Sequence, residues 1–368
     1  MTTTSVSAPS KPLRVGLIAP PWVQVPPTVY GGTEVVVDQL ARGLTRAGCD
    51  VLLFTTGDSM CPVERRWLYP GALGTVADLS AEAAHVARAY RELADMDVIH
   101  DHTLTGPQWA AEHRHAVPVV TTAHGEFTPE MRRHYAAVAA AGVGVVAISH
   151  SQRRTAPEIP MVAVIHHGID PASFPVGRGT GGYVMFLGRM HPAKGAHRAI
   201  AVARTAHKRI VVAAKMWEPA ERRYFTECVE PLLGDDAVYV GEVGGSHKLD
   251  LLADAEALLN PIRWPEPFGL VMIEALACGT PVLSFAEGAA PEIVEHGRSG
   301  FLCDDEDDMA AAVALVPSLD RADCRARVEA AFTTDRMVRD HLSLYRHLTD
   351  CPLDVDPAEA ERMPMVGA

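Results

Sequence analysis

Short apolar runs alternate with segments of helical spacing along most of the chain. A short apolar run bounded by turn residues predicts a buried strand, and apolar residues three and four apart predict an amphipathic helix. The alternation is the same in both halves, and it predicts an α/β protein of two doubly wound domains that face a central cleft. The predicted strands are Arg14–Ala19, Val51–Thr55, Met96–His102, Val117–Ala123, Gly144–Ser149, Met161–His166, Tyr183–Gly188, Arg209–Ala213, Ala237–Val240, Ala255–Asn260 and one that starts at Pro281.

The first strand leads through the loop Pro20–Gly32 into a helix that we expect to start at Thr33 and to stop at Gly48. A strand, a glycine-containing turn and a helix in this order place a ligand at the carboxyl ends of the strands. The pair Gly31 and Gly32 can therefore lie against a ligand or can serve only as a tight turn. A dinucleotide fingerprint, G-x-G-x-x-G after the first strand, is absent.

The chain divides into four segments. We expect residues 1–12 to be disordered, 13–170 to form an N-terminal Rossmann-like domain and 171–334 to form a C-terminal one. The Gly- and Pro-rich stretch Gly168–Gly182 is the predicted hinge between them. Residues 335–368 are expected to form a helix, up to about Leu348, that crosses back to the first domain, and then a tail.

Composition narrows the class of protein. Its 48% hydrophobic and 21% charged residues are typical of a soluble globular protein. The net charge of −13 disfavours nucleic acid or an anionic membrane surface as a partner. No apolar run is long enough to span a bilayer, and the first residues lack the apolar core of a signal peptide. Seven cysteines without a CxxC pair indicate free thiols, so we expect a cytoplasmic protein. The oligomeric state stays open.

The stretch Pro261–Leu283 carries the strongest candidate chemistry. A helix is expected to open near Gly269, and it is apolar on every face except at Glu274. A buried carboxylate is costly unless something donates hydrogen bonds to it. Glu266 lies in the loop just before the helix N-terminus, whose free N–H groups favour an anion or a polyhydroxylated ligand. The sequence thus predicts two carboxylates around one set of backbone donors.

Arg189 and Lys194 flank the loop that follows strand Tyr183–Gly188. A strand-to-helix loop of this kind is where a diphosphate binds, and an acidic protein needs a local positive region for such a ligand. The alternative is a solvated basic loop. Lys215, after the next strand, is expected to be a surface lysine rather than another cation of the cleft.

Histidines gather at two strand ends of the N-terminal half. His100 and His102 lie on one face of a strand, but two ligands do not complete a metal site. We expect a cluster near the cleft without metal. His124 ends the next strand, where a histidine is either functional or a plain surface residue.

The segments EPFGLVMIE, ALACGTPV and GRMHPAKG resemble the signatures of retaining nucleotide-sugar glycosyltransferases of family 4, which have the GT-B fold. RWPEPFGLVMIEALACGTPV looks most like the subgroup around the avilamycin-pathway glycosyltransferase. His167-Gly168-Ile169-Asp170 is similar to the family's N-G-[IV]-D turn, with His in place of Asn. The basic stretch Met131–His134 is shorter than the basic helix of lipid-acceptor relatives, so the resemblance disfavours a membrane acceptor.

The resemblance implies roles for particular residues. Glu266 faces the donor sugar, Glu274 binds the ribose, and Arg189 and Lys194 hold the donor diphosphate. His124 points at the sugar. The remaining implied contacts to substrate are Gly31, Gly32, Val243, Gly244, Pro267, Phe268, Gly269 and Leu270, of which Val243 and Gly244 belong to the loop around the base.

The implied reaction moves glucose or N-acetylglucosamine from a UDP-sugar, or less favoured a GDP-sugar, to a hydroxyl of a soluble acceptor with retention of configuration. It implies neither a cofactor nor a metal. Three alternatives stay open. The two glutamates can be a glycosidase pair, although such a pair needs both carboxyls at one anomeric carbon. The chain can also be a GT-B-type epimerase or phosphorylase, or a non-catalytic nucleotide-sugar-binding protein.

Overall fold

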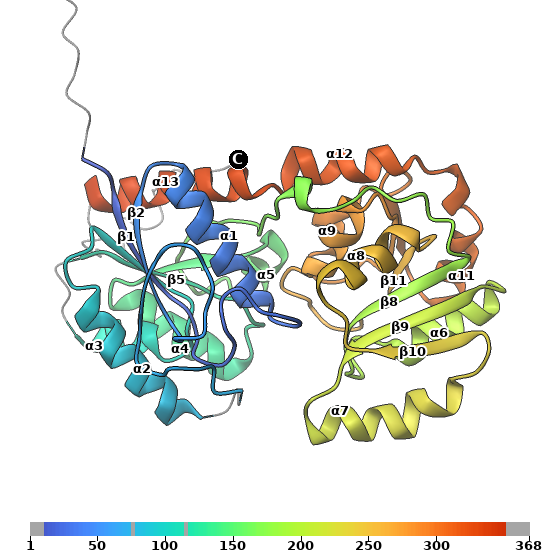
Figure 1. Cartoon of the computed structure of the whole chain (residues 1–368), viewed down its shortest axis with the longest axis horizontal. Helices are drawn as coiled ribbons and strands as arrows, with labels where there is room; N and C mark the ends of the chain where they lie inside the picture. Colours follow the sequence, from blue (N-terminus) through green and yellow to red (C-terminus); the bar gives the residue numbers. More distant parts are fainter. Residues whose placement is uncertain (1–10, 75–77, 114–116, 351–368) are drawn as a thin grey trace, which may run out of the picture.

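The computed structural model describes residues 11–74, 78–113 and 117–350. The predicted disordered start therefore lies almost wholly outside the described residues, and so does the predicted tail after the last helix. The described chain forms two lobes, each built on one parallel sheet with helices on both faces (Figure 1).

The N-terminal domain holds a seven-stranded sheet in the order β3-β2-β1-β4-β5-β6-β7. Its strands are β1 (Arg14–Ile18), β2 (Asp50–Thr55), β3 (Glu64–Trp67), β4 (Val98–Asp101), β5 (Val119–Thr122), β6 (Gly144–Ala147) and β7 (Met161–Val164). Its helices are α1 (Gly32–Arg46), α2 (Leu79–Glu92), α3 (Gly106–Glu112), α4 (Pro129–Ala140) and α5 (His150–Thr155).

The C-terminal domain holds a six-stranded sheet in the order β10-β9-β8-β11-β12-β13. Its strands are β8 (Tyr183–Arg189), β9 (Arg209–Lys215), β10 (Ala237–Gly241), β11 (Leu258–Asn260), β12 (Val282–Phe285) and β13 (Gly300–Cys303). Its α-helices are α6 (Ala196–Thr205), α7 (Pro219–Tyr224), α8 (Gly245–Asp254), α9 (Leu270–Ala277), α10 (Ala290–Ile293), α11 (Glu306–Val313) and α12 (Arg321–Ala331). Short 3₁₀ turns lie at Pro171–Ser173, Glu230–Leu232 and Val316–Ser318, and a π turn at Phe225–Val229.

Both sheets reverse their strand order at one point, which fixes where a ligand can lie. β1 pairs in parallel with both β2 and β4, and β8 pairs with both β9 and β11. In doubly wound sheets the crevice opens at the carboxyl ends of the strands at this switch point. The two crevices face each other, so the predicted fold class, two Rossmann-like domains around a cleft, is confirmed.

The last helix, α13 (Thr334–Asp350), lies on the N-terminal domain although it follows the C-terminal domain in sequence (Figure 1). Its buried face packs on α1, and the core that they share includes Leu40, Leu44 and Val338. Tyr345 is fully buried there, and its hydroxyl lies 2.6 Å from Nδ1 of His100. The helix is thus part of the first domain's core.

The chain crosses between the domains twice, and the two crossings are bonded to each other. Ile169 N donates to the carbonyl of Phe332 at 2.9 Å, and Thr334 N donates to the carbonyl of Ile169 at 2.9 Å. A Cβ on Gly168 would lie 2.3 Å from the carbonyl oxygen of Thr333, so this close approach requires glycine. From Gly177 onward the predicted hinge is already hydrogen-bonded to the C-terminal domain, so only its first part lies between the domains.

Candidate active site

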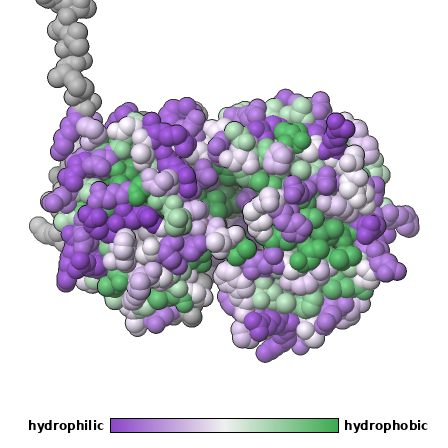
Figure 2. Space-filling model, viewed as in Figure 1, coloured by the Kyte–Doolittle hydropathy of each residue, from purple (hydrophilic) through white to green (hydrophobic). Residues whose placement is uncertain are grey.

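A cavity of about 440 Å³ lies between the two domains. The N-terminal domain contributes the loop after β1, the first turn of α1 and the end of β5, and the C-terminal domain contributes the ends of β8, β9 and β10 and the start of α9. On the molecular surface a groove separates the two lobes, and apolar residues lie within it (Figure 2). This is the crevice that the two strand-order switch points predict.

The N-terminus of α9 opens onto the cavity at Gly269. Gly269 has φ of 92°, in the left-handed region, and a Cβ there would lie 2.7 Å from Cε of Met272. Glycine therefore lets the chain turn into the helix with its first N–H groups open to the cavity. Further along α9, Glu274 is 7% exposed and accepts a hydrogen bond from Lys248 Nζ at 2.8 Å. Lys248 also lines the cavity, and sequence reasoning missed it.

Lys194 and Glu266 meet directly, although 72 positions separate them. The ammonium group of Lys194 forms an ion pair with Glu266, and Trp264 Nε1 donates to the same carboxylate at 2.8 Å. Lys194 Nζ also lies 5.1 Å from the centre of the Trp264 ring. The structure thus brings the predicted basic loop and the predicted carboxylate loop together at one edge of the cavity.

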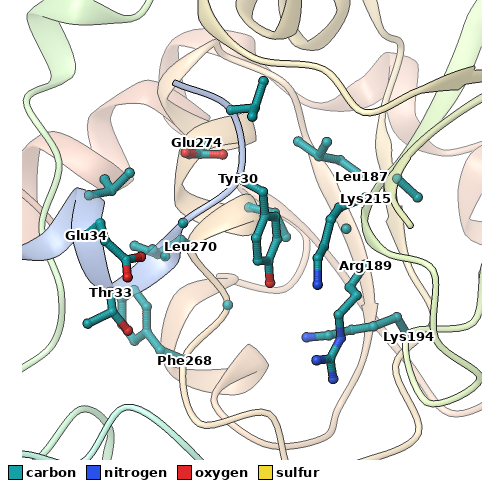
Figure 3. A pocket seen from close by; sticks show the side chains of 18 of the residues that line it. Tyr30, Thr33, Glu34, Leu187, Arg189, Lys194, Lys215, Phe268, Leu270 and Glu274 are labelled. Atoms are coloured by element: carbon teal, nitrogen blue, oxygen red, sulfur yellow. The ribbon is translucent and has the colours of Figure 1, made fainter. Parts of the chain in front are cut away.

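The prediction that Lys215 is a surface lysine is wrong. It is only 5% exposed and it lines the cavity beside Arg189 and Lys194 (Figure 3). Its Nζ lies 3.4 Å from Oε1 of Glu221 and 4.5 Å from the centre of the Trp217 ring. Trp217 lies in the loop after β9 and Glu221 lies in α7, and together they hold the lysine inside the cleft.

Glu221 positions two of the cations. The same Oε1 atom lies 3.6 Å from Nε of Arg189, and the side chain is almost fully buried. Burial alone would raise the pKa of Glu221, but hydrogen bonds from backbone N–H groups and the charge of Lys215 lower it. A buried carboxylate that stays charged fixes Arg189 and Lys215 side by side. No sequence motif marked Glu221.

Tyr30 reaches across the cleft from the N-terminal domain. Its ring centre is 5.3 Å from Lys215 Nζ and 6.2 Å from the Trp217 ring, which it meets edge-on. In the close-up view Tyr30 lies between Glu274 and the cations of the C-terminal domain (Figure 3). Tyr30 thereby occupies the space between Glu274 and the basic residues of the C-terminal domain (Figure 3).

Four histidines cluster on the side of the N-terminal domain, and two of them, His124 and His167, line the cavity. Nε2 of His124 lies 2.9 Å from Nδ1 of His102, and the ring centre of His124 is 5.3 Å from that of His167. His100 is bonded to Thr122 and to Tyr345. Burial lowers the pKa of His124 to about 3, so the ring is neutral at physiological pH. Within the described residues no group of three or more His, Cys, Asp or Glu could hold a metal ion.

Glu34 faces the cavity from the first turn of α1, opposite the cations (Figure 3). It is 6% exposed, and burial raises its pKa from 4.5 to about 7. The sequence prediction did not include it, because an acidic residue in the first turn of a helix is usual and gives no signal of its own.

Most of the predicted site residues line this one cavity. Those that do are Gly31, Gly32, His124, Arg189, Lys194, Val243, Glu266, Phe268, Gly269, Leu270 and Glu274. Gly244 and Pro267 do not line it. Gly244 caps α8 and its Cα faces the backbone of Thr28 and Val29, and Pro267 is buried between two lining residues. The diphosphate interpretation requires that Arg189 and the start of α9 share one cavity, and both line it.

Two Rossmann-like domains that face a shared cavity are the arrangement of the GT-B fold. The profiles of two glycosyltransferase domains match this chain. Glycosyltransferase Family 4 matches residues 30–173, and Glycosyl transferases group 1 matches residues 174–331. The chain carries both domains and belongs with the glycosyltransferases of this family.

Relatives over nearly the whole chain are also glycosyltransferases. D-inositol 3-phosphate glycosyltransferase of Acidothermus cellulolyticus is 28% identical, over 93% of this chain and 92% of that protein. Phosphatidyl-myo-inositol mannosyltransferase of Mycolicibacterium smegmatis is also 28% identical, over 82% and 84%. The crystal structure of AviGT4, a glycosyltransferase involved in avilamycin A biosynthesis, is 27% identical with a TM-score of 0.69, over 92% and 99%.

The six described cysteines, Cys49, Cys61, Cys228, Cys278, Cys303 and Cys324, are free thiols, as predicted; Cys351 lies outside the described residues. Across residues 11–350, apart from the two short gaps, no helix combines the length and the apolar character that a bilayer crossing requires.

Proposed function

We propose that this chain transfers a hexose from a nucleoside diphosphate sugar to a hydroxyl group, with retention of the anomeric configuration and without a metal ion. The observation that carries the proposal is the convergence of Arg189, Lys194, Lys215 and the N-terminus of α9 on one cavity. A diphosphate is the ligand whose charge fits three cations and a set of free backbone N–H groups. Glu274, deeper in the same cavity, suits the ribose diol of the donor.

The same groups account for catalysis. Negative charge grows on the diphosphate as the glycosyl bond breaks, so cations and backbone donors at that position stabilise the transition state more than the ground state. A hydrogen bond to a charged group contributes about 1.5–3 kcal/mol. Three or four of them could supply much of the ~8 kcal/mol that marks the low end of enzymic acceleration.

The donor proposed first is a UDP-sugar with glucose or N-acetylglucosamine. The loop before α8, with Val243 on the cavity wall, leaves room for the base, and glycines on both sides of it allow close backbone contact. Glu266 and His124 are proposed to face the sugar, since both line the cavity. The transferred sugar would leave its diphosphate beside the basic loop and meet the acceptor on the side of the N-terminal domain.

Two measurements test the proposal. A thermal-shift screen of UDP-, GDP- and dTDP-sugars should show stabilisation by one nucleotide class. Release of nucleoside diphosphate should then become fast only when an acceptor is present. Donor binding without acceptor-dependent release would favour the non-catalytic binding protein, and conversion of the nucleotide sugar without any acceptor would favour the epimerase. Absence of any shift would refute the proposal.

A further inference from the structure

The two sides of the cavity differ in charge. Four cations line it, namely Arg189, Lys194, Lys215 and Lys248, and all of them belong to the C-terminal domain. Among the described residues, the N-terminal domain contributes no lysine or arginine to the lining. A phosphate bound on that side would have no cationic partner there, and anions need one when they leave water.

The group that the N-terminal domain does present is the carboxyl of Glu34. In Figure 3 its carboxyl oxygens point into the cavity from the wall opposite Lys215 and Arg189. It is 6% exposed, and within the described residues no other side chain forms a hydrogen bond or an ion pair with it. Its own backbone N–H is the donor that reaches it. A buried carboxyl without a side-chain partner is costly, and a ligand that donates to it removes that cost.

The surroundings of Glu34 suit a ring that carries hydroxyl groups. Gly31 and Gly32 bring bare backbone to the cavity directly before it, and Trp22 and Val23 add an apolar wall from the same loop. Apolar walls with a few convergent polar groups are typical of small-molecule sites. The neighbouring His124 and His167 are neutral, because burial holds the pKa of each well below its ordinary value, so they do not supply the missing positive charge.

We infer that the acceptor is a neutral polyhydroxylated molecule, such as a sugar or a cyclitol without phosphate, and that Glu34 binds one of its hydroxyl groups. The inference rests on the proposed function, since it assigns the acceptor of the same site. It sets this chain apart from the relatives that are named for D-inositol 3-phosphate, whose acceptor carries a phosphate. Glu34 is a specificity-determining residue in this assignment, and the diphosphate remains with the cations across the cavity.

The test uses the full chain and two matched pairs of acceptors, myo-inositol with its 3-phosphate and glucose with its 6-phosphate. The donor is the UDP-, GDP- or dTDP-sugar that gives the largest thermal shift, and release of nucleoside diphosphate is followed. The wild type should use a neutral member with a KM at least about tenfold below that of its phosphorylated partner. Glu34→Ala should raise that KM about tenfold or more, the loss expected for one hydrogen bond to a charged group, with a smaller change in kcat. Glu34→Gln should raise that KM less than Glu34→Ala does.

Asp38→Asn is the matched control, because Asp38 is buried one turn further along α1 and does not line the cavity. It should leave the KM for the neutral acceptor unchanged. A wild type that prefers the phosphorylated members, that uses no neutral member, or whose KM is the same after Glu34→Ala overturns the inference. Failure of the proposed function is distinct, since it would appear in the wild type as the absence of any donor-dependent thermal shift, or as a shift without faster release of nucleoside diphosphate with any of the four acceptors.

Discussion

Replacing Glu34 with glutamine should stabilise the fold, although it removes a charge from the proposed site. The carboxyl is buried without a side-chain partner among the described residues, and its pKa rises from 4.5 to about 7. A raised pKa means that the folded state binds a proton more tightly than the unfolded chain, so ionisation above about pH 7 costs stability. At about 1.4 kcal/mol for each of about 2.5 pKa units, the cost is about 3.5 kcal/mol. Because the glutamine amide is also buried, we expect a gain of about 1–3 kcal/mol in the free energy of unfolding at about pH 8.

Urea denaturation of wild type and Glu34→Gln at about pH 8 and about pH 5 measures this gain. The gain should shrink toward pH 5, because the folded wild type is then protonated and pays little for burial. Asp38→Asn should behave in the opposite way, since Asp38 is bonded to Arg42 at 2.8 Å and its loss removes a favourable contact. A Glu34→Gln variant that is equally stable at both pH values, or less stable at about pH 8, would refute the assignment of an unpartnered buried carboxyl.

Three further predictions concern the donor side and the histidines. Glu274→Ala should abolish most of the donor-dependent thermal shift, and a full shift would contradict the ribose assignment. Lys215→Met should weaken binding of nucleoside diphosphate about tenfold or more in calorimetry, while Glu221 keeps its contact with Arg189; unchanged affinity would mean that the lysine does not reach the ligand. Burial lowers the pKa of His124 to about 3 and that of His341 to about 4, so the unfolded chain binds protons that the folded state excludes. Below about pH 6.5 each should therefore remove about 1.4 kcal/mol of stability per pH unit, and urea midpoints that stay flat down to about pH 5 would exclude this.

The apolar pattern predicted the interior strands well because both faces of a parallel sheet are buried. It missed two edge strands: β3 (Glu64–Trp67), whose residues are mostly polar and exposed, and β13 (Gly300–Cys303), which is only four residues long. It also ran past the strand ends, for example by starting at Met96 a strand that begins at Val98, since apolar residues continue into buried loops. Motif residues such as Arg189 and Glu266 were found because a strand-to-helix loop has a local signature.

Residues that depend on distant partners had no such signature. Lys215 was taken for a surface residue because Tyr30, which covers it from the N-terminal domain, is distant in sequence, and because Glu221 close by carries no motif of its own. Lys248 reaches Glu274 from another helix, and nothing in its own neighbourhood indicates the pairing. Glu34 follows two glycines that the sequence analysis did single out, but its lack of a side-chain partner becomes visible only in three dimensions.

The two segments that connect the domains are hydrogen-bonded to each other at Ile169 and Thr334, and this determines how the domains can be exchanged between proteins. Since α13 completes the core of the first lobe, cutting the chain once at the junction would strip that lobe of its last helix. The C-terminal domain is better regarded as an insertion into the N-terminal domain, and both connections lie at the same pair of backbone hydrogen bonds. An exchange of C-terminal domains between relatives should therefore replace the segment between the two crossings and leave α13 with its original N-terminal domain.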